Sequence, residues 1–339
     1  MTVRSARLHA IGDVRVEQED VPVPTDGESL VRMTAVGLCG SDLHWFAEGG
    51  IGDAQLAAPL VLGHEMAGVV QGGPLDGRRV AVDPADSCGA CEQCRKGYRN
   101  LCPTVRFAGH GRNDGGLREY VAWPTALLHP VPDAVSDAGA AMLEPLGVAL
   151  HAMDLARLRI GATVVVVGCG PIGLCVVQLA RLGGAAHVVA VEPLAHRRAA
   201  AAAMGAGVVL DPGADDLVAR LDAATGGRGA DVVLEVAGTD DAVTLAVEAA
   251  RPGARVVLAG IPASDSTTFP ASVARRKGLT LSLVRRMNDT YPRTISLVER
   301  GAVDVESVVS DTFPLARVAE AFATAERRAG LKVIVEPGA

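Results

Sequence analysis

Hydrophobic and polar positions follow two different patterns along the chain. Up to about residue 130, short segments alternate between apolar and polar residues and are separated by Gly and Pro turns, as in residues 7–10 and 14–17 on either side of Gly12. Residues 30–36 form another such segment. Alternation with a period of two is typical of half-buried strands. The pattern therefore predicts a β-rich, partly barrel-like domain in the first part of the chain.

From residue 164 the pattern changes to continuous apolar runs. Residues 164–167 are all valine, which is typical of a parallel strand buried on both faces. Further strands are expected at residues 187–191, 208–210, 231–235, 255–259 and 279–283. Helices are expected at residues 195–204, 240–250, 291–300 and 315–328, and a last strand at 332–335. Strands that alternate with helices predict a doubly wound α/β sheet.

Length and composition narrow the class of protein. A chain of 339 residues is longer than one ordinary single-core domain, so we expect two domains. Its 49% hydrophobic residues indicate a globular protein, and a net charge of -7 without a basic block excludes nucleic acid as an expected partner. The N-terminus lacks a long apolar region, and no apolar run is long enough for a bilayer. We therefore expect a cytoplasmic protein without membrane contact.

A cluster of cysteines is the first candidate metal site. In a reducing compartment, the seven cysteines indicate metal binding before disulfides. Four of them, three at Cys-x-x-Cys spacing, lie in a charged, polar loop, which is unlike core cysteine: Cys88, Cys91, Cys94 and Cys102. Four thiolates close a tetrahedral coordination sphere, so we predict a structural zinc in a lobe of about residues 86–104.

A second, mixed ligand set lies upstream. His64 and Glu65 are adjacent, and Cys39 precedes them in the chain. A thiol, an imidazole and a carboxylate suit zinc, and a site with three protein ligands leaves a position for water or substrate. The alternative is a surface loop whose His and Glu face water.

A glycine-rich turn follows the four valines. It reads Gly-Cys-Gly-Pro-Ile-Gly between a predicted strand and a helix, where a dinucleotide's pyrophosphate is bound. We expect this contact at Gly168, Gly170, Pro171, Ile172 and Gly173. Glu192 ends the next strand, at the distance expected for the acid that binds the adenosine ribose. Its charge favours NAD over NADP, although Arg197 and Arg198 could instead receive a 2′-phosphate.

Several segments together resemble one enzyme family. They are residues 39–45 (Cys-Gly-Ser-Asp-Leu-His-Trp), 50–53 (Gly-Ile-Gly-Asp), 62–65 (Leu-Gly-His-Glu) and 143–146 (Leu-Glu-Pro-Leu). Over essentially its whole length the chain resembles the zinc-dependent medium-chain dehydrogenases of the alcohol dehydrogenase superfamily, most closely the sorbitol (polyol) dehydrogenases. The resemblance implies a GroES-like catalytic domain of residues 1–145 and 283–339, and a Rossmann NAD-binding domain of residues 146–282.

The resemblance also implies residue roles. Cys39, His64 and Glu65 would hold a catalytic zinc, and Glu144 would bind that zinc directly or through its water. Glu144 would otherwise be a buried, ion-paired glutamate, which is costly in an apolar segment. Ser41 and His44 match the family's proton relay, although His44 alone could be a surface histidine. Residues that match the polyol pocket are Trp45, Phe107 and Arg286, of which the two aromatic residues could instead belong to the core.

Two departures from the family leave the substrate open. Met287 stands where polyol dehydrogenases commonly have tyrosine, and residues 107–114 differ from the usual pocket loop, which brings His110 and Arg112 close to the expected substrate path.

The prediction is therefore a zinc- and NAD-dependent oxidation of a secondary hydroxyl in a small polyol or sugar-like substrate. It includes two zinc ions per chain, a preference for NAD of about a hundredfold or more, and, from the resemblance, a homodimer or homotetramer. The same chemistry on threonine, a vicinal diol or an amino-cyclitol is an alternative. A non-catalytic dinucleotide sensor and a zinc-free reductase are others, but the complete zinc set argues against both.

Overall fold

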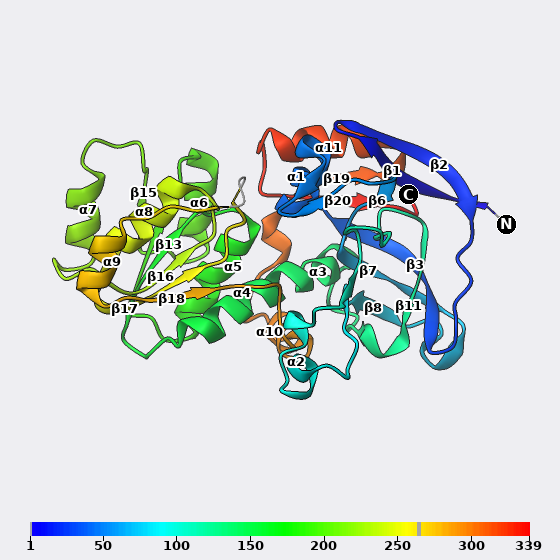
Figure 1. Ribbon diagram of the computed structural model, residues 1–339, viewed down its shortest axis with the longest axis horizontal. Coiled ribbons are helices and arrows are strands. Elements are labelled where there is room, and N and C mark those ends of the chain that lie inside the picture. The colour runs from blue at the N-terminus through cyan, green and yellow to red at the C-terminus, as the bar shows by residue number, and fades with distance from the viewer. Residues whose placement is uncertain (1, 263–265) are drawn as a thin grey trace. The chain divides into compact units, whose positions relative to one another are not determined.

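The computed structural model describes residues 2–262 and 266–339, and the chain divides into two compact units (Figure 1). Unit 1 consists of Met1–Glu144 and Asn288–Ala339, and unit 2 of Pro145–Met287. The expected limits lay at residues 145 and 282, so the second boundary falls later in the structure. No helix within the described residues is both long and apolar enough to cross a membrane.

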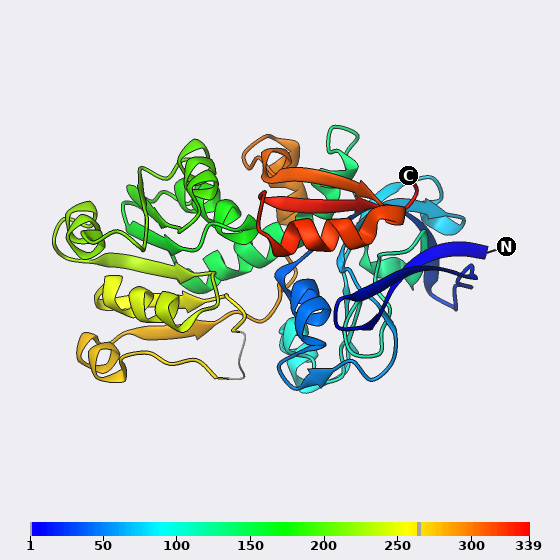
Figure 2. The ribbon, with the colours of Figure 1, turned by 90° about the horizontal axis from the view of Figure 1, so that it is seen from above.

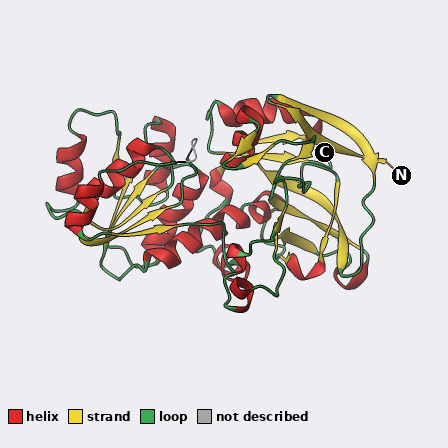
Figure 3. Ribbon diagram, in the orientation of Figure 1, coloured by secondary structure: helices red, strands yellow, loops and turns green. Residues whose placement is uncertain are grey.

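Unit 1 is built mainly of strands (Figure 3). Within its described residues, a seven-stranded sheet has the order β12-β8-β7-β3-β20-β19, with β11 paired to β3, and a three-stranded sheet has the order β2-β1-β6. The strands of these sheets are β1 (Thr2–Ala10), β2 (Asp13–Asp20), β3 (Glu28–Gly37), β6 (Leu60–Val61), β7 (Glu65–Gln71), β8 (Arg79–Val82), β11 (Tyr120–Pro124), β12 (Leu128–Pro130), β19 (Val309–Pro314) and β20 (Lys332–Glu336). Two short pairs are β4 (Gly50–Ile51) with β5 (Ala54–Gln55), and β9 (Ala85–Asp86) with β10 (Arg106–Phe107). The predicted β-rich domain is confirmed.

The helices of unit 1 are short. They are α1 (Gly40–Glu48), α2 (Glu92–Arg95), α3 (Asp137–Ala141), α10 (Tyr291–Glu299) and α11 (Val318–Glu326). Helix α11 lies along β19 and β20, as Figure 2 shows, and Phe322 on this helix is fully buried. Phe322 stacks on Phe46 of α1 with ring centroids 4.7 Å apart. These aromatic contacts tie both helices to the core that the strands form around Leu8, Met33 and Met66.

Unit 2 contains the predicted doubly wound sheet. Among the described residues it has six parallel strands in the order β15-β14-β13-β16-β17-β18. The strands are β13 (Thr163–Val167), β14 (His187–Val191), β15 (Val208–Leu210), β16 (Ala230–Glu235), β17 (Ala250–Leu258) and β18 (Thr280–Leu283). The helices are α4 (Leu143–Ala156), which starts in unit 1, α5 (Pro171–Leu182), α6 (Ala195–Ala203), α7 (Leu217–Ala224), α8 (Asp240–Ala249) and α9 (Ala271–Lys277). The strand order reverses between β13 and β16, and this point is where such folds bind ligands.

The structure differs from the sequence-based expectation at several elements. Helix α1 and strand β19 were not predicted, since residues 40–48 and 309–314 carry no strong apolar period. Strand β17 begins at Ala250 instead of residue 255. Its first part was not predicted because it includes Pro252 and Gly253, residues that are uncommon inside strands. The predicted helix at 315–328 begins as a 3₁₀ turn at Leu315–Arg317 before α11.

Candidate functional site

The first candidate metal centre joins a sulfur, a ring nitrogen and a carboxylate oxygen, all within 4.8 Å of one another, from Cys39, His64 and Glu65. Neighbouring strands deliver them, because Cys39 follows β3, whereas Glu65 begins β7. The register pairs Gly37 with Glu65, so the two strand ends meet. His64 is 6% and Glu65 1% exposed. Three such ligands around a vacant position fit a zinc ion of the catalytic kind.

Asp42, on the first turn of α1, orients this cluster. Its Oδ2 accepts the backbone N–H of Cys39 at 2.9 Å, and its Oδ1 accepts that of Gly63 at 3.0 Å. Oδ1 also lies 3.5 Å from Nδ1 of His64. With Nδ1 turned to a carboxylate, Nε2 is the nitrogen left for a metal, an arrangement that fixes the ring and makes it a better ligand.

Asp42 and His64 each stabilise the charged form of the other. Burial opposes ionisation of Asp42, but the charge and hydrogen bond of His64 and the N–H groups of Cys39 and Gly63 outweigh it and lower the pKa of Asp42. Burial likewise opposes protonation of His64, but Asp42 raises the pKa of that imidazole well above its ordinary value. The metal-free site therefore holds an ion pair, and a metal would replace a proton on His64.

Lys332 forms a buried ion pair with Oε2 of Glu65, and their side chains are 2% and 1% exposed. Burial opposes the charge of Lys332, but Glu65, Cys39 and Glu144 together raise its pKa. The Glu65 side chain reaches Lys332 over Gly37, where an added Cβ would lie 2.0 Å from Oε2. A larger residue at that position of β3 would displace the Glu65 carboxylate and the end of the Lys332 side chain. Lys332 thus compensates negative charge that would otherwise be costly to bury.

Glu144 is close to the cluster electrostatically but is not among its three ligand atoms within 4.8 Å. Its side chain is 4% exposed. Burial, reinforced by the charge of Glu65 and opposed by His64 and Lys332, raises the pKa of Glu144 to about 7.

The two predicted relay residues lie three positions apart on α1. The hydroxyl of Ser41 is 3.4 Å from Nε2 of His64, so Ser41 faces the metal ligands. His44 is partly exposed, and its Nδ1 lies 3.0 Å from a carboxylate oxygen of Glu48. Ser41 thus lies beside the candidate metal ligands, whereas His44 is paired with Glu48 nearer to solvent.

The three predicted substrate residues have different surroundings. The ring of Phe107 lies 5.3 Å, centroid to centroid, from that of His64. Trp45 is 1% exposed within the hydrophobic core, and its ring meets that of His110 edge-on at 5.5 Å. Arg286 belongs to unit 2 and has a positive φ of 56°. Within unit 1, Phe107 is therefore the predicted pocket residue whose ring contacts a candidate ligand, His64.

The second candidate metal centre consists of four sulfur atoms within 4.8 Å of one another, those of Cys88, Cys91, Cys94 and Cys102. The N–H groups of Cys88, Cys91 and Cys94 donate to neighbouring sulfurs at 3.5, 3.3 and 3.4 Å. The N–H groups of Ala90 and Cys91 lower the pKa of Cys88 to about 6, whereas burial and the Cys91 thiol raise that of Cys94 to about 11. None of the seven cysteines, each within the described part of the chain, forms a disulfide. Four sulfurs that accept N–H groups fit a tetrahedral zinc.

The glycine turn of unit 2 has the geometry that a dinucleotide needs. Gly168 has a φ of 95°, and its N–H donates to Val191 at 2.8 Å. A Cβ on Gly173 would lie 2.0 Å from the carbonyl oxygen of Gly168, so the helix packs directly on the turn. A Cβ on Gly170 would meet only Nη1 of Arg197, at 3.7 Å. The space beside Gly170 is therefore open within the described residues, as the predicted approach of a phosphate to this backbone requires. The first residues of α5 are Pro171, Ile172 and Gly173.

Glu192 lies beside this turn and is 4% exposed. One carboxylate oxygen accepts the N–H of Cys169 at 2.8 Å and the other accepts that of Leu194 at 3.0 Å. Arg198 does not point to the turn: its guanidinium donates to the backbone oxygen of Glu192 at 2.7 Å and lies 2.9 Å from a carboxylate oxygen of Asp211.

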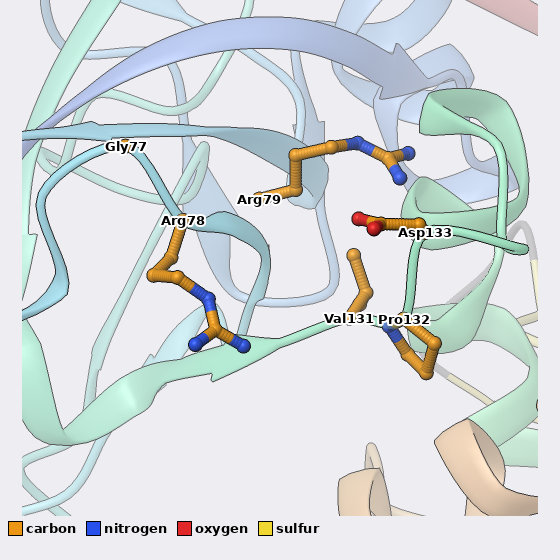
Figure 4. Close-up of a pocket in the computed structure, with 6 residues that line it drawn as sticks. All are labelled: Gly77, Arg78, Arg79, Val131, Pro132 and Asp133. Atoms are coloured by element: carbon orange, nitrogen blue, oxygen red, sulfur yellow. The ribbon is translucent and has the colours of Figure 1, made fainter.

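One pocket of about 360 Å³ lies elsewhere in unit 1 (Figure 4). It is lined by Gly77, Arg78, Arg79, Val131, Pro132 and Asp133. Arg79 is engaged by the Asp137 carboxylate at 2.7 Å. The pocket contains none of the candidate site residues, and we assign it no chemistry.

Sequence reasoning missed two residues of the first centre, Asp42 and Lys332. Asp42 stands three residues after Cys39, the spacing at which a side chain caps the start of a helix, and this signal could have found it. Lys332 is one of few lysines in the chain and begins an apolar strand, but its partner Glu65 lies too far away in sequence to be inferred.

Comparisons with known proteins cover both units. Residues 25–133 match the family model described as alcohol dehydrogenase GroES-like domain, and residues 171–300 match the zinc-binding dehydrogenase model. Sorbitol dehydrogenase of Bacillus subtilis is 32% identical over 345 aligned positions, which cover 99% of this chain and 97% of that protein.

Solved structures agree. L-idonate 5-dehydrogenase of Escherichia coli is 28% identical with a TM-score of 0.92, over 99% of this chain and 98% of that one. 2R,3R-butanediol dehydrogenase of Bacillus subtilis is 29% identical with a TM-score of 0.88, over 99% of each chain. The expected GroES-like and Rossmann combination is confirmed.

Proposed function

Because the chain belongs to the zinc-binding alcohol dehydrogenase family, we propose that it oxidises a secondary hydroxyl of a polyol or sugar alcohol and passes the hydride to a nicotinamide coenzyme. It is an enzyme of the zinc-dependent polyol dehydrogenase branch. Threonine and amino-cyclitol substrates, a non-catalytic sensor and a zinc-free reductase are not favoured by these relatives.

The observation that carries this proposal is the buried Cys39–His64–Glu65 cluster with its supporting charges. A protein that only senses a dinucleotide has no need of three converging metal ligands. It also has no need of Asp42 to turn the His64 ring, or of Lys332 to compensate Glu65. These groups are costly to bury unless they serve a metal.

The chain's own residues define the chemistry. A zinc ion at this cluster supplies a Lewis acid for the substrate oxygen, and a nicotinamide ring supplies the hydride acceptor. Ser41, beside Nε2 of His64, takes the proton that leaves the hydroxyl, and His44 carries it toward solvent. Glu144, whose pKa is raised to about 7 by burial, would stand beside the metal's ligands as a second group able to accept the one proton that leaves the hydroxyl. Phe107 covers His64 and keeps bulk water away.

We also propose that the coenzyme is NAD. Glu192 lies at the end of β14, where the adenosine ribose is bound in this fold, and its carboxylate repels a 2′-phosphate. Arg198, the alternative phosphate ligand, is held by backbone oxygens and by Asp211. Releasing it would break those contacts.

The experiment is a screen of NADH formation with polyols, vicinal diols, simple alcohols and threonine. Activity on a polyol series that a chelator abolishes and zinc restores supports the proposal. The variant His64→Ala should lose activity by a factor of about a thousand or more while NADH binding persists. His187→Ala, which removes an exposed histidine of unit 2, is the matched control and should stay active. Full activity in His64→Ala would refute the zinc mechanism.

A further inference from the structure

A buried carboxylate that has no role in the metal centre lies at the end of a central strand of unit 2. Glu235 is the last residue of β16 and is 1% exposed. Its Oε1 accepts the backbone N–H groups of Ala237 at 2.7 Å and Gly238 at 2.6 Å. The carboxylate therefore fixes the loop that follows its own strand.

The same side chain reaches the loop that follows the neighbouring strand, β17. A Cβ on Gly260 would lie 2.8 Å from Oε2 of Glu235 and 2.1 Å from the nitrogen of Gly238. A Cβ on Gly238, whose φ is +79°, would lie 2.3 Å from the carbonyl oxygen of Ile261. The backbone oxygen of Glu235 accepts the N–H of Ala259 at 2.8 Å. The two loops thus touch backbone to backbone around one carboxylate.

A third segment joins them. Ala237 packs on Gly168, the first glycine of the turn, since a Cβ on Gly168 would lie 3.0 Å from both the nitrogen and the Cβ of Ala237. The N–H of Val236 donates to Val167, the last residue of β13, at 2.9 Å. The segments that follow β13, β16 and β17 therefore meet around Glu235, at the carboxyl ends of these strands.

The position of these loops in the sheet indicates what they hold. The strand order reverses between β13 and β16, so a dinucleotide crosses the sheet edge there. Glu192, after β14, marks the adenosine side. The loops after β16 and β17 lie on the other side of the crossing point, where the nicotinamide half must bind.

Burial of a carboxylate costs free energy that burial of an apolar side chain does not, so packing alone does not explain a glutamate at position 235. Oε2 is buried and accepts no hydrogen bond of ordinary geometry from any residue in the described part of the chain. Burial raises the pKa of Glu235, although the N–H groups of Gly238, Ala237 and Gly260 oppose that shift. An apolar side chain would avoid this cost but would leave the N–H groups of Ala237 and Gly238 without an acceptor.

We propose that Glu235 is a positioning residue for the nicotinamide half of the coenzyme, because it holds the loops at residues 236–238 and 259–261 in the shape that receives it. The inference rests on the proposed use of a nicotinamide coenzyme. Glu235 touches no reacting atom itself; it acts through the backbone of the loops.

The test compares two ligands that share the adenosine half. Dissociation constants of NADH and of ADP-ribose, which lacks the nicotinamide ring, are measured by fluorescence titration and calorimetry for the zinc-loaded full chain and for Glu235→Ala. We expect the constant for NADH to rise about tenfold or more and that for ADP-ribose to change less than about twofold. Glu248→Ala, which removes an exposed carboxylate on α8 of the same unit, should leave both constants unchanged.

Glu235→Gln keeps an oxygen that can accept from the N–H groups of Ala237 and Gly238, so it should retain most of the NADH affinity. If Glu235→Ala does not fold, the two dissociation constants are measured on Glu235→Gln instead. An equal loss of affinity for both ligands in either variant, or no loss of affinity for either ligand in Glu235→Ala, would overturn the assignment. If the unmutated protein binds neither ligand, the proposed coenzyme is wrong, which is a different failure from that of Glu235.

Discussion

Asp42 and His64 form a buried ion pair in which one carboxylate holds two metal ligands at once. Oδ1 of Asp42 lies 3.5 Å from Nδ1 of His64, and Oδ2 accepts the N–H of Cys39 at 2.9 Å. The thiol follows β3 and the imidazole precedes β7, so this one side chain at the start of α1 adds to the pairing of the two strands in setting their relative position.

Replacement of Asp42 by Asn should weaken zinc binding at the first centre about 10- to 100-fold, because the amide cannot stabilise the ring as a carboxylate does. Competition with a chromophoric chelator measures the affinity. Asp26→Asn, at an exposed turn of the same unit, should bind zinc like the unmutated protein. Unchanged affinity in Asp42→Asn would show that strand geometry alone holds the ligands.

Replacement of Cys102 by Ser should reduce the zinc content from the predicted two ions per chain to one and lower the melting temperature. The remaining three sulfurs no longer close a tetrahedral site. Elemental analysis of the purified protein gives the ion count directly. Cys175→Ala, at a buried cysteine of α5 outside both centres, should keep two ions. A single ion in the unmutated protein would refute the prediction.

Coenzyme preference should follow Glu192. We expect kcat/KM with NAD to exceed that with NADP about a hundredfold or more, and Glu192→Gln to narrow this ratio about tenfold, because the charge that repels the 2′-phosphate is gone. Steady-state kinetics with both coenzymes measures it, and Asp215→Asn, an exposed acid of the same unit, is the control. Equal rates with NADP would mean that Arg197 or Arg198 binds the phosphate.

The metal-free protein should lose stability as pH rises because of Glu144. Burial raises the pKa of Glu144 in the folded chain to about 7, against an ordinary value of 4.5, so the folded state keeps a proton that the unfolded state releases. This contribution is fully present below pH 4.5 and disappears as pH rises toward 7, by on the order of 3 kcal/mol.

The difference in unfolding free energy between the metal-free protein and Glu144→Gln isolates this effect, since the amide does not titrate. Denaturant titrations at several pH values between 4 and 8 measure it. Added zinc should reduce the slope, because its charge favours the carboxylate. Parallel curves for the two proteins would contradict the assignment to Glu144.

Much of the fold could be predicted from sequence because each signal was local. Four consecutive valines before a glycine turn indicate a buried parallel strand and its loop, and the structure places β13 and Gly168 accordingly. The mixed sheet of unit 1 gave weaker signals, since β19 and β20 pair in parallel with each other while β20 pairs antiparallel with β3. Such pairings depend on contacts between distant segments, which no local period records.

The residues of the candidate site also divide into those that local sequence spacing indicates and those whose role depends on distant contacts. The sequence predicts two groups of candidate metal ligands from their spacing, and the structure brings the ligand atoms of each group within 4.8 Å of one another. Lys332 could not be predicted in this way, because its role follows from where β20 lies. The role of Glu235 was also hidden, since it read only as the end of a strand and its value depends on Gly260 in the next loop.

The pairing of β20 with β3 also constrains the order in which the protein is made. The N–H of Leu38, next to Cys39, donates to Val333, and Lys332 compensates Glu65. During synthesis the N-terminal segments leave the ribosome long before residues 332–336. Until these residues arrive, the nascent first unit carries an uncompensated acid in its centre. The first unit can therefore complete its core only after residues 332–336 are made, whereas all of unit 2 precedes them in the chain.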